Sequence, residues 1–209
     1  RGKLENFITV TKKLLEVNED NFFLRAHDRQ LTVIVESNTA QTNTRFFEPV
    51  LLKIYDKLTA FFPKNSIYAG VSNICNSLHN LNFTYDEANF ALTAGKKLDK
   101  DKYLFFYEDY MIFHLLSAVS EHPTINKIYK NTVDRLKKYD GEHEQELLKT
   151  LSALVENDFS VAETSKALFI HRNTLYKRIE KINSVLNFNI DQSKNRLLLQ
   201  LALTLDKML

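Results

Sequence analysis

A short segment near the carboxyl end of the chain gathers residue types that contact nucleic acid. Within residues 171–184 there are four basic residues and one acidic residue, namely Arg172, Lys177, Arg178 and Lys181 against Glu180. Arginine forms paired hydrogen bonds with guanine, asparagine forms them with adenine, and cations neutralise phosphates. Arg172 and the adjacent Asn173 are therefore candidates for contacts with base edges.

Other polar residues in or near this segment are candidates for the same surface. Ser160 is expected both to cap a helix and to donate a hydrogen bond to a phosphate. The remaining candidates are expected to bind phosphates or to extend the reading of bases: His171, Thr174, Tyr176, Lys177, Arg178 and Lys181. With Arg172 and Asn173 they form the predicted DNA-contacting set.

The apolar residues of the segment predict which of its sides is buried. Leu175, Ile179, Ile182 and Leu186 recur at helical intervals and form one stripe along a helix. The polar and basic side chains fall on the opposite side of that helix. A recognition helix needs this division, because the stripe holds it on its domain while the other side enters the major groove.

A shorter helix is predicted just upstream. Ser160-Val161-Ala162-Glu163 has the form of a capping box and predicts a helix that ends near Leu168. A short helix, a tight turn and a longer helix, in that order, make a helix-turn-helix motif. Spacing alone leaves one alternative open, a small helical bundle whose solvent-facing side happens to be basic.

The distribution of charge favours the same region. The formal net charge of the 209-residue chain is only +2, which is too small for the overall charge to indicate nucleic-acid binding. Residues 1–115 carry 14 basic and 14 acidic side chains, residues 116–144 carry 5 and 5, and residues 145–209 carry 9 and 7. The whole basic excess therefore lies in the C-terminal third.

The first half of the chain alternates strand and helix patterns. Apolar runs at 22–24 and 31–35 predict a β-hairpin, and 67–71 and 103–107 predict two more strands. Helices are predicted at 4–16, at 47–62, and from a Thr84-Tyr85-Asp86-Glu87 capping box to Leu98. This order suggests a single antiparallel or mixed sheet with helices on one face, which is an α+β fold.

From Tyr110 onward only helices are predicted. A helix at 124–139 carries charges on its outer face and suits a connector, and further helices are expected at 147–155 and at 197–209. We therefore expect an α+β domain at 1–115, a helical connector at 116–141 and an all-α domain at 142–209. The connector and the last helix are also candidates for a dimer contact, or for ordinary core.

The sequence of the predicted turn and recognition helix resembles a known family. The run Ala167-Leu168-Phe169-Ile170-His171-Arg172-Asn173-Thr174-Leu175-Tyr176-Lys177-Arg178-Ile179 is similar to the C-terminal helix-turn-helix of the PucR-type bacterial regulators, also called the CdaR or sugar-diacid-regulator type. The resemblance implies a transcription factor that binds operator DNA and controls catabolic genes in response to a metabolite. Family members usually carry an effector-sensing region upstream, so we expect the effector to be sensed outside this chain, which is expected to be a fragment.

The resemblance extends to the first half of the chain. Tyr68-Ala69-Gly70-Val71-Ser72 and Phe83-Thr84-Tyr85-Asp86-Glu87-Ala88 are similar to the family's central domain, a degenerate relative of the diguanylate-cyclase palm with a ferredoxin-like sheet. Where an active cyclase has Gly-Gly-Asp-Glu-Phe, this chain has Ala26-His27-Asp28-Arg29-Gln30. Without the paired glycines and the acidic pair, neither phosphate nor a divalent ion is well bound. Cyclase activity is therefore not expected.

The turn departs from the related Fis-type modules at one position. Many of those modules have glycine where this chain has Phe169. A residue other than glycine can occupy a strained turn when its side chain is anchored by packing. We therefore expect Phe169 to be buried in the core, with a cost of a few kcal/mol for Phe169→Ala.

Composition excludes several other classes of protein. The single cysteine, Cys75, cannot form an internal disulfide, and the six histidines show no metal-ligand spacing. No apolar run approaches the roughly 18 residues of a membrane span, and no leader sequence is evident. We expect a cytoplasmic protein without metal, cofactor or catalytic residues.

The predicted function is that of a sequence-specific regulator that binds double-stranded DNA. One recognition helix reads only a few base pairs, so a homodimer or higher oligomer is expected. Two alternatives remain, a nucleotide sensor or enzyme on the palm-like domain and a protein-interaction module with a vestigial DNA-binding fold. No phosphate loop or nucleophile constellation supports the first, and the placement of charge disfavours the second.

Overall fold

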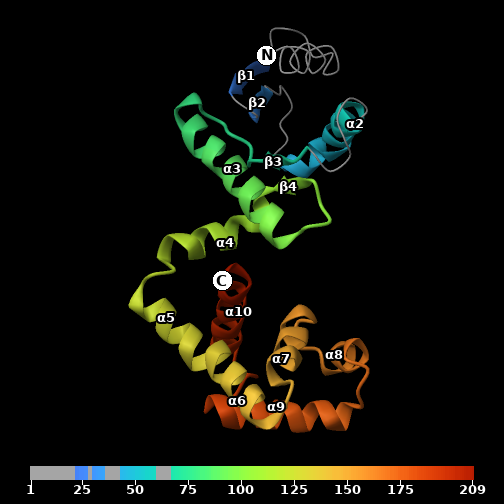
Figure 1. Ribbon diagram of the computed structural model, residues 1–209, viewed down its shortest axis with the longest axis vertical. Helices are drawn as coiled ribbons and strands as arrows, with labels where there is room; N and C mark the ends of the chain where they lie inside the picture. The colour runs from blue at the N-terminus through green and yellow to red at the C-terminus, as the bar shows by residue number, and fades with distance from the viewer. Residues whose placement is uncertain (1–21, 28–29, 36–42, 60–66) are drawn as a thin grey trace. The chain divides into compact units, whose positions relative to one another are not determined.

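The computed structural model describes residues 22–27, 30–35, 43–59 and 67–209 (Figure 1). The chain divides into two compact units, residues 1–111 and residues 112–209. The first contains all the described strands and the second contains only helices among its elements. The α+β class predicted from the sequence is confirmed. The helix predicted at 4–16 lies outside the described residues.

The predicted hairpin is present in unit 1. Strands β1 (Phe22–His27) and β2 (Gln30–Val35) pair antiparallel, with Phe22 opposite Val35 and His27 opposite Gln30. The period-2 pattern of the second run already indicated this strand. Residues 28–29, between the two strands, lie outside the described residues.

Unit 1 also contains a β-α-β element. Strands β3 (Ala69–Val71) and β4 (Leu104–Phe106) pair in parallel, and the chain between them contains the short helix η3 (Leu78–Asn80) and helix α3 (Leu81–Leu98). The described strands form two separate two-stranded sheets, so the single sheet expected from the sequence is not observed among them. Strand patterns predict individual strands, whereas pairing depends on contacts between segments distant in sequence.

Helix α3 packs so closely on this sheet that two glycines are required. A Cβ atom at Gly70 would lie 2.0 Å from the carbonyl oxygen of Ala88, and one at Gly95 would lie 2.2 Å from the ring of Phe105. Both distances are far below van der Waals contact. The close approach of helix and sheet therefore depends on the absence of side chains at these two positions.

The capping box predicted at Thr84 is wrong. Helix α3 begins at Leu81, three residues earlier, and Thr84 lies inside it. The Thr84 hydroxyl donates to the carbonyl oxygen of Asn80 at 2.9 Å, the back-bond that threonine forms within helices. The preceding turn, η3, supplies the start of the helix that the sequence pattern assigned to Thr84.

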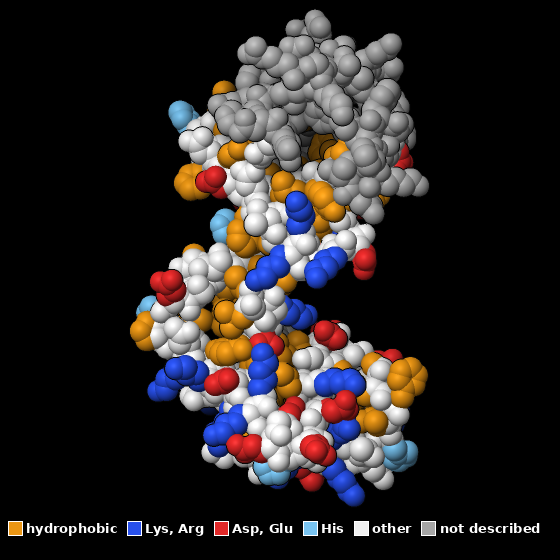
Figure 2. Space-filling view, in the orientation of Figure 1, with side chains coloured by type: hydrophobic (Ala, Val, Ile, Leu, Met, Phe, Trp, Pro, Cys, Tyr) orange, Lys and Arg blue, Asp and Glu red, His pale blue; other side chains and the backbone are white. Residues whose placement is uncertain are grey.

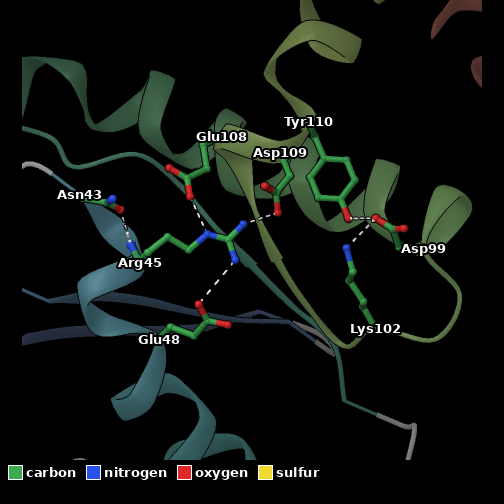
Figure 3. A network of polar contacts seen from close by, with 8 residues as sticks. All are labelled: Asn43, Arg45, Glu48, Asp99, Lys102, Glu108, Asp109 and Tyr110. Carbon is green, nitrogen blue, oxygen red and sulfur yellow. Dashed lines mark hydrogen bonds and ion pairs between the residues drawn. The ribbon is translucent and has the colours of Figure 1, made fainter. Parts of the chain in front are cut away.

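Arg45 joins the segment before one helix to the first turn of another (Figure 3). Arg45 lies in η2 (Thr44–Phe47), which leads into α2 (Glu48–Thr59). Its guanidinium binds Glu108 and Asp109 in the first turn of α4 (Tyr107–Val119), and it lies 4.2 Å from the centre of the Phe106 ring. The helix predicted at 47–62 is thus confirmed through residue 59, and residues 60–62 lie outside the described part of the chain.

A second polar contact in Figure 3 closes the loop before β4. The Tyr110 hydroxyl donates to Asp99 at 2.5 Å, and Lys102 lies 3.3 Å from the same carboxylate oxygen. Burial, then the hydrogen bond to Asp99, raises the pKa of Tyr110 above its usual value, so the hydroxyl stays protonated as a donor.

Unit 2 is a bundle of helices around one apolar core. After the end of α4, its helices are α5 (Pro123–Tyr129), the π-helical turn η4 (Lys130–Asp134), α6 (Arg135–His143), α7 (Leu147–Glu156), α8 (Val161–Ala167), α9 (Arg172–Leu186) and α10 (Ser193–Met208). The helices predicted at 147–155, after Ser160 and along the 175–186 stripe correspond to α7, α8 and α9. The single helix predicted at 124–139 is divided into α5, η4 and α6, and α10 begins four residues before the predicted start at 197. The core draws residues from η4, α6, α7, α9 and α10.

The predicted connector is part of this bundle. Val133 in η4 and Leu136 in α6 are fully buried in the core of unit 2, as are Leu199 and Ala202 of α10. Both candidates for a dimer contact therefore use apolar faces to build the core of their own unit. The expected connector, 116–141, lies within unit 2, whose boundary falls at residue 112.

Candidate nucleic-acid interface

Helices α8 and α9 form the helix-turn-helix, and α9 is fixed by its apolar stripe. Leu175 and Ile182 are fully buried, Leu186 is nearly so, and Ile179 packs against the same core. Burying each such side chain contributes roughly 1.5–3 kcal/mol, so the stripe sets how α9 is rotated about its axis. The opposite face is thereby held toward solvent.

Side chains cap both helices of the motif. The Ser160 hydroxyl accepts a hydrogen bond from the backbone N–H of Glu163 at 3.4 Å, which confirms Ser160 as the N-cap of α8. The reciprocal half of a capping box is not formed, because the Ser160 N–H donates to the carbonyl oxygen of Asn157 and the Glu163 carboxylate pairs with Lys166. His171 is the N-cap of α9, and its Nδ1 accepts from the backbone N–H of Asn173 at 3.2 Å. These caps place both residues at the amino ends of their helices.

The exposed face of α9 carries most of the predicted DNA-contacting set. The exposed members are His171, Arg172, Asn173, Thr174, Tyr176, Lys177 and Lys181. The side chains of Arg172, Asn173 and Lys177 form no hydrogen bond or ion pair with any residue that the structure describes. Their donors are thus available to a ligand without first breaking a contact within the protein.

Arg178 is held differently from its neighbours. Its guanidinium donates to the Thr150 hydroxyl at 3.0 Å and lies 3.7 Å from a carboxylate oxygen of Glu146, so it binds the start of α7. A hydrogen bond from Lys149, together with the charge of Arg178, holds the pKa of Glu146 below its usual value. In this structure Arg178 ties α9 to α7, and its side chain is only about a quarter exposed (25%).

Lys181 makes an intermediate case. Its ammonium lies 4.9 Å from the centre of the Tyr139 ring, and that ring stacks on His143 of the same helix, α6. Lys181 nevertheless remains exposed. A cation over an exposed aromatic ring is worth about 0.5–1 kcal/mol, which is small enough for the side chain to leave the ring when a phosphate is near.

The expectation that Phe169 is buried is wrong. Its side chain is 96% exposed, and its backbone lies in the left-handed region with φ of 54°. The turn is held by the backbone, because the N–H of Phe169 binds the carbonyl oxygen of Lys166 and the N–H of Ile170 binds that of Ser165. These two bonds form a Schellman motif, so the turn does not need the anchoring side chain that we expected.

The surface around the motif is mixed in charge but carries exposed cations. Figure 2 shows lysine and arginine side chains, interspersed with acidic ones, on the part of unit 2 formed by α8 and α9. Lys166 on α8 adds a cation that sequence reasoning did not select, and it is paired with Glu163 at 2.9 Å. Its position at the end of α8, next to the turn that leads into α9, is the sequence feature that indicates it.

Within the described residues, no helix is long and apolar enough to span a membrane. The described residues also contain no cluster of three or more histidine, cysteine or acidic side chains arranged to hold a metal ion.

Comparison with known families matches both halves of the chain. Residues 3–94 match the GGDEF-like domain, and residues 147–205 match the PucR C-terminal helix-turn-helix domain. The second match begins at the first residue of α7 and ends within α10, so it covers the helices that position the exposed face of α9. The chain thus combines a GGDEF-like domain with a PucR C-terminal helix-turn-helix domain.

Individual regulators of the PucR/CdaR type are similar over most of this chain. The purine catabolism regulatory protein of Bacillus subtilis is 30% identical over 146 residues, which are 70% of this chain and 27% of that protein. The carbohydrate diacid regulator of Escherichia coli is 30% identical over 156 residues, 75% of this chain and 38% of that protein. The proline-responsive transcriptional activator PutR of B. subtilis is 29% identical over 142 residues, 68% of this chain and 34% of that protein. The matched region is thus a minor part of each relative.

Proposed function

We propose that this chain binds duplex DNA through α8 and α9 and acts as a sequence-specific regulator of catabolic genes rather than as an enzyme. The observation that carries the proposal is the exposed face of α9. The side chains of Arg172, Asn173 and Lys177 lie there without partners among the described residues, on a helix whose opposite face is buried in the core. This is the arrangement that a major-groove helix requires.

Each exposed side chain has a role that follows from its chemistry. Arg172 and Asn173, in the first turn of α9, read base edges, since arginine pairs with guanine and asparagine with adenine. Lys177 and Lys181 bind phosphates, with Ser160, His171, Thr174 and Tyr176 adding phosphate contacts or extending the readout. Arg178 supports the interface from inside, because its guanidinium is engaged by α7.

The partners follow from the same geometry and from the relatives. One recognition helix reads few base pairs, so the chain acts as a homodimer or higher oligomer on a two-fold symmetric operator. The relatives are named for purine catabolism, carbohydrate diacids and proline, which supports control of catabolic genes by a small-molecule effector in the cytoplasm. The effector is sensed by a region outside this chain.

The test is selection followed by a salt series. A pool of random-sequence duplexes is bound to the chain, and the enriched duplex is titrated at increasing KCl concentrations. We expect a defined motif and a linear fall of log affinity with log salt, with a slope of about −0.9 per phosphate contact. Enrichment of no motif, together with affinity that does not depend on salt, would contradict the proposal.

A further inference from the structure

The turn of the helix-turn-helix displays an aromatic side chain that the fold does not use. Phe169 is 96% exposed and has φ of 54°, a region that glycine occupies without strain. Glycine is the usual residue at this position of a Schellman motif, and the motif's two hydrogen bonds involve backbone atoms only. Phenylalanine here is unfavourable both for its backbone and for its exposure to water.

Another phenylalanine of unit 2 shows what a structural role looks like in the same backbone region. Phe159 has φ of 60°, but its ring is partly buried against the core and lies 4.6 Å from the guanidinium of Arg196. Packing thus accounts for Phe159. The ring of Phe169 has no comparable packing among the described residues, since nearly its whole surface is exposed.

The surroundings of Phe169 indicate what covers it. Lys166 lies three residues before it on α8, and His171 and Arg172 follow it at the amino end of α9; all three are exposed. The nearest acidic residue in sequence, Glu163, is paired with Lys166. An apolar ring bordered by cations matches the backbone of a nucleic acid, in which apolar deoxyribose faces alternate with phosphates.

We propose that Phe169 packs its ring against a deoxyribose of the DNA strand that borders the recognition helix. This inference rests on the proposed function and adds to it a non-ionic contact made by the turn. The neighbouring cations bind the flanking phosphates, and the ring excludes water from the sugar between them. The left-handed backbone directs the side chain out of the motif, and the Schellman bonds hold it there in advance of binding.

The test compares Phe169→Ala, Phe169→Gly and Phe169→Leu with the parent chain on the duplex enriched by selection. We expect both Phe169→Ala and Phe169→Gly to weaken binding about tenfold at every KCl concentration, since part of an apolar side chain is no longer buried. The slope of log affinity against log salt should stay unchanged, because no phosphate contact is lost. Phe169→Leu, which keeps an apolar group, should recover part of the affinity.

Stability separates this role from a structural one. The thermal midpoint without DNA should be unchanged in Phe169→Ala and unchanged or higher in Phe169→Gly, because glycine relieves the backbone. Phe159→Ala is the matched control, and it should lower the midpoint. A lowered midpoint in Phe169→Ala, or unaltered affinity in both variants, overturns the proposal.

The two proposals fail in different ways. If the parent chain binds the duplex with a steep salt slope and Phe169→Ala binds equally well, only the contact at Phe169 is overturned. If sedimentation shows that Phe169→Ala alters self-association while the affinity of each protomer for DNA is unchanged, the ring contacts a second copy and the proposal is again overturned. If the parent chain binds no duplex at any KCl concentration, both proposals fail.

Discussion

At the scale of single residues, the cations of α9 differ in what already binds them. Lys177 has no partner among the described residues, whereas Arg178, the next residue, donates to Thr150 and pairs with Glu146. Their directions differ because successive residues of a helix are rotated by about 100°. A basic run in the sequence thus supplies both groups that face a ligand and groups that hold the helix in place.

Two exposed cations of the recognition helix, Arg172 and Lys177, are expected to respond differently to truncation. Arg172→Ala should cost roughly 1–3 kcal/mol of binding on the preferred duplex and relax the sequence preference, because a base contact is lost. Lys177→Ala should weaken binding to all duplexes about equally and reduce the salt slope by about one contact. Titration of both variants on the preferred and on a scrambled duplex measures this. Identical effects of the two changes on every duplex would refute the assignment of roles.

Arg178→Ala should act through stability. Thr150 is fully buried, and removing the guanidinium deprives its hydroxyl of a charged donor, so we expect a loss of roughly 1–3 kcal/mol in the free energy of unfolding. Denaturant unfolding of the chain measures this loss, with Lys177→Ala as the exposed control of unchanged stability. If instead Arg178→Ala leaves stability intact and flattens the salt slope as Lys177→Ala does, Arg178 contacts a phosphate.

At the scale of elements, α3 packs closely against the parallel pair β3–β4 in unit 1. The helix approaches the sheet at Gly70 and Gly95, where no side chain intervenes. Phe105, which Gly95 faces, is almost completely buried. The position of α3 is therefore set by contacts that a single added methyl group would disturb.

Gly95→Ala and Gly141→Ala form a matched pair that tests this packing. A Cβ at Gly95 would lie 2.2 Å from the Phe105 ring, so overpacking should cost roughly 1–3 kcal/mol, more than the roughly 1 kcal/mol gained in helix propensity. Gly141 lies in α6 with nothing within 4 Å of an added Cβ, so alanine there should be neutral or stabilising by up to about 1 kcal/mol. Denaturant unfolding compares the two. Equal stability of both variants would contradict the packing described.

At the scale of the whole molecule, each of the two units is compact in its own right. The core of unit 2 is closed by side chains from η4, α6, α7, α9 and α10, all within residues 112–209. The helix-turn-helix is fixed by that core, because the buried stripe of α9 is part of it. The interface can thus be formed without residues from unit 1.

Residues 112–209 should therefore fold and bind DNA when produced alone. We expect a helical circular dichroism spectrum and a single cooperative transition in denaturant, as for other small domains with one core. For the enriched duplex, the slope of log affinity against log salt should be the same for residues 112–209 as for the full chain, when affinity is expressed per protomer. A gradual, non-cooperative loss of helical signal would show that unit 2 needs the rest of the chain.

The sequence alone determined most of the local structure of the helix-turn-helix. The N-cap at Ser160, the stripe from Leu175 to Leu186 and the helix ends depend on neighbours within a few residues, so periodicity and residue type predict them. The exposed face of α9 followed directly, since burying one stripe of a helix leaves the opposite side in water. The strand predicted from alternation at 31–35 is likewise present, as β2.

Tertiary structure alone decided which side chains on that face are engaged and how the strands pair. Arg178 is held by Thr150, a residue 28 positions earlier, and β3 pairs with β4, which follows α3 in the chain. The local spacing of residues therefore predicts neither contact. Phe169 was misread because burial was inferred from the need to anchor a non-glycine residue in a strained turn, whereas two backbone hydrogen bonds hold that turn. Local patterns record how a segment prefers to fold, but contacts between distant segments depend on the positions of both partners in space.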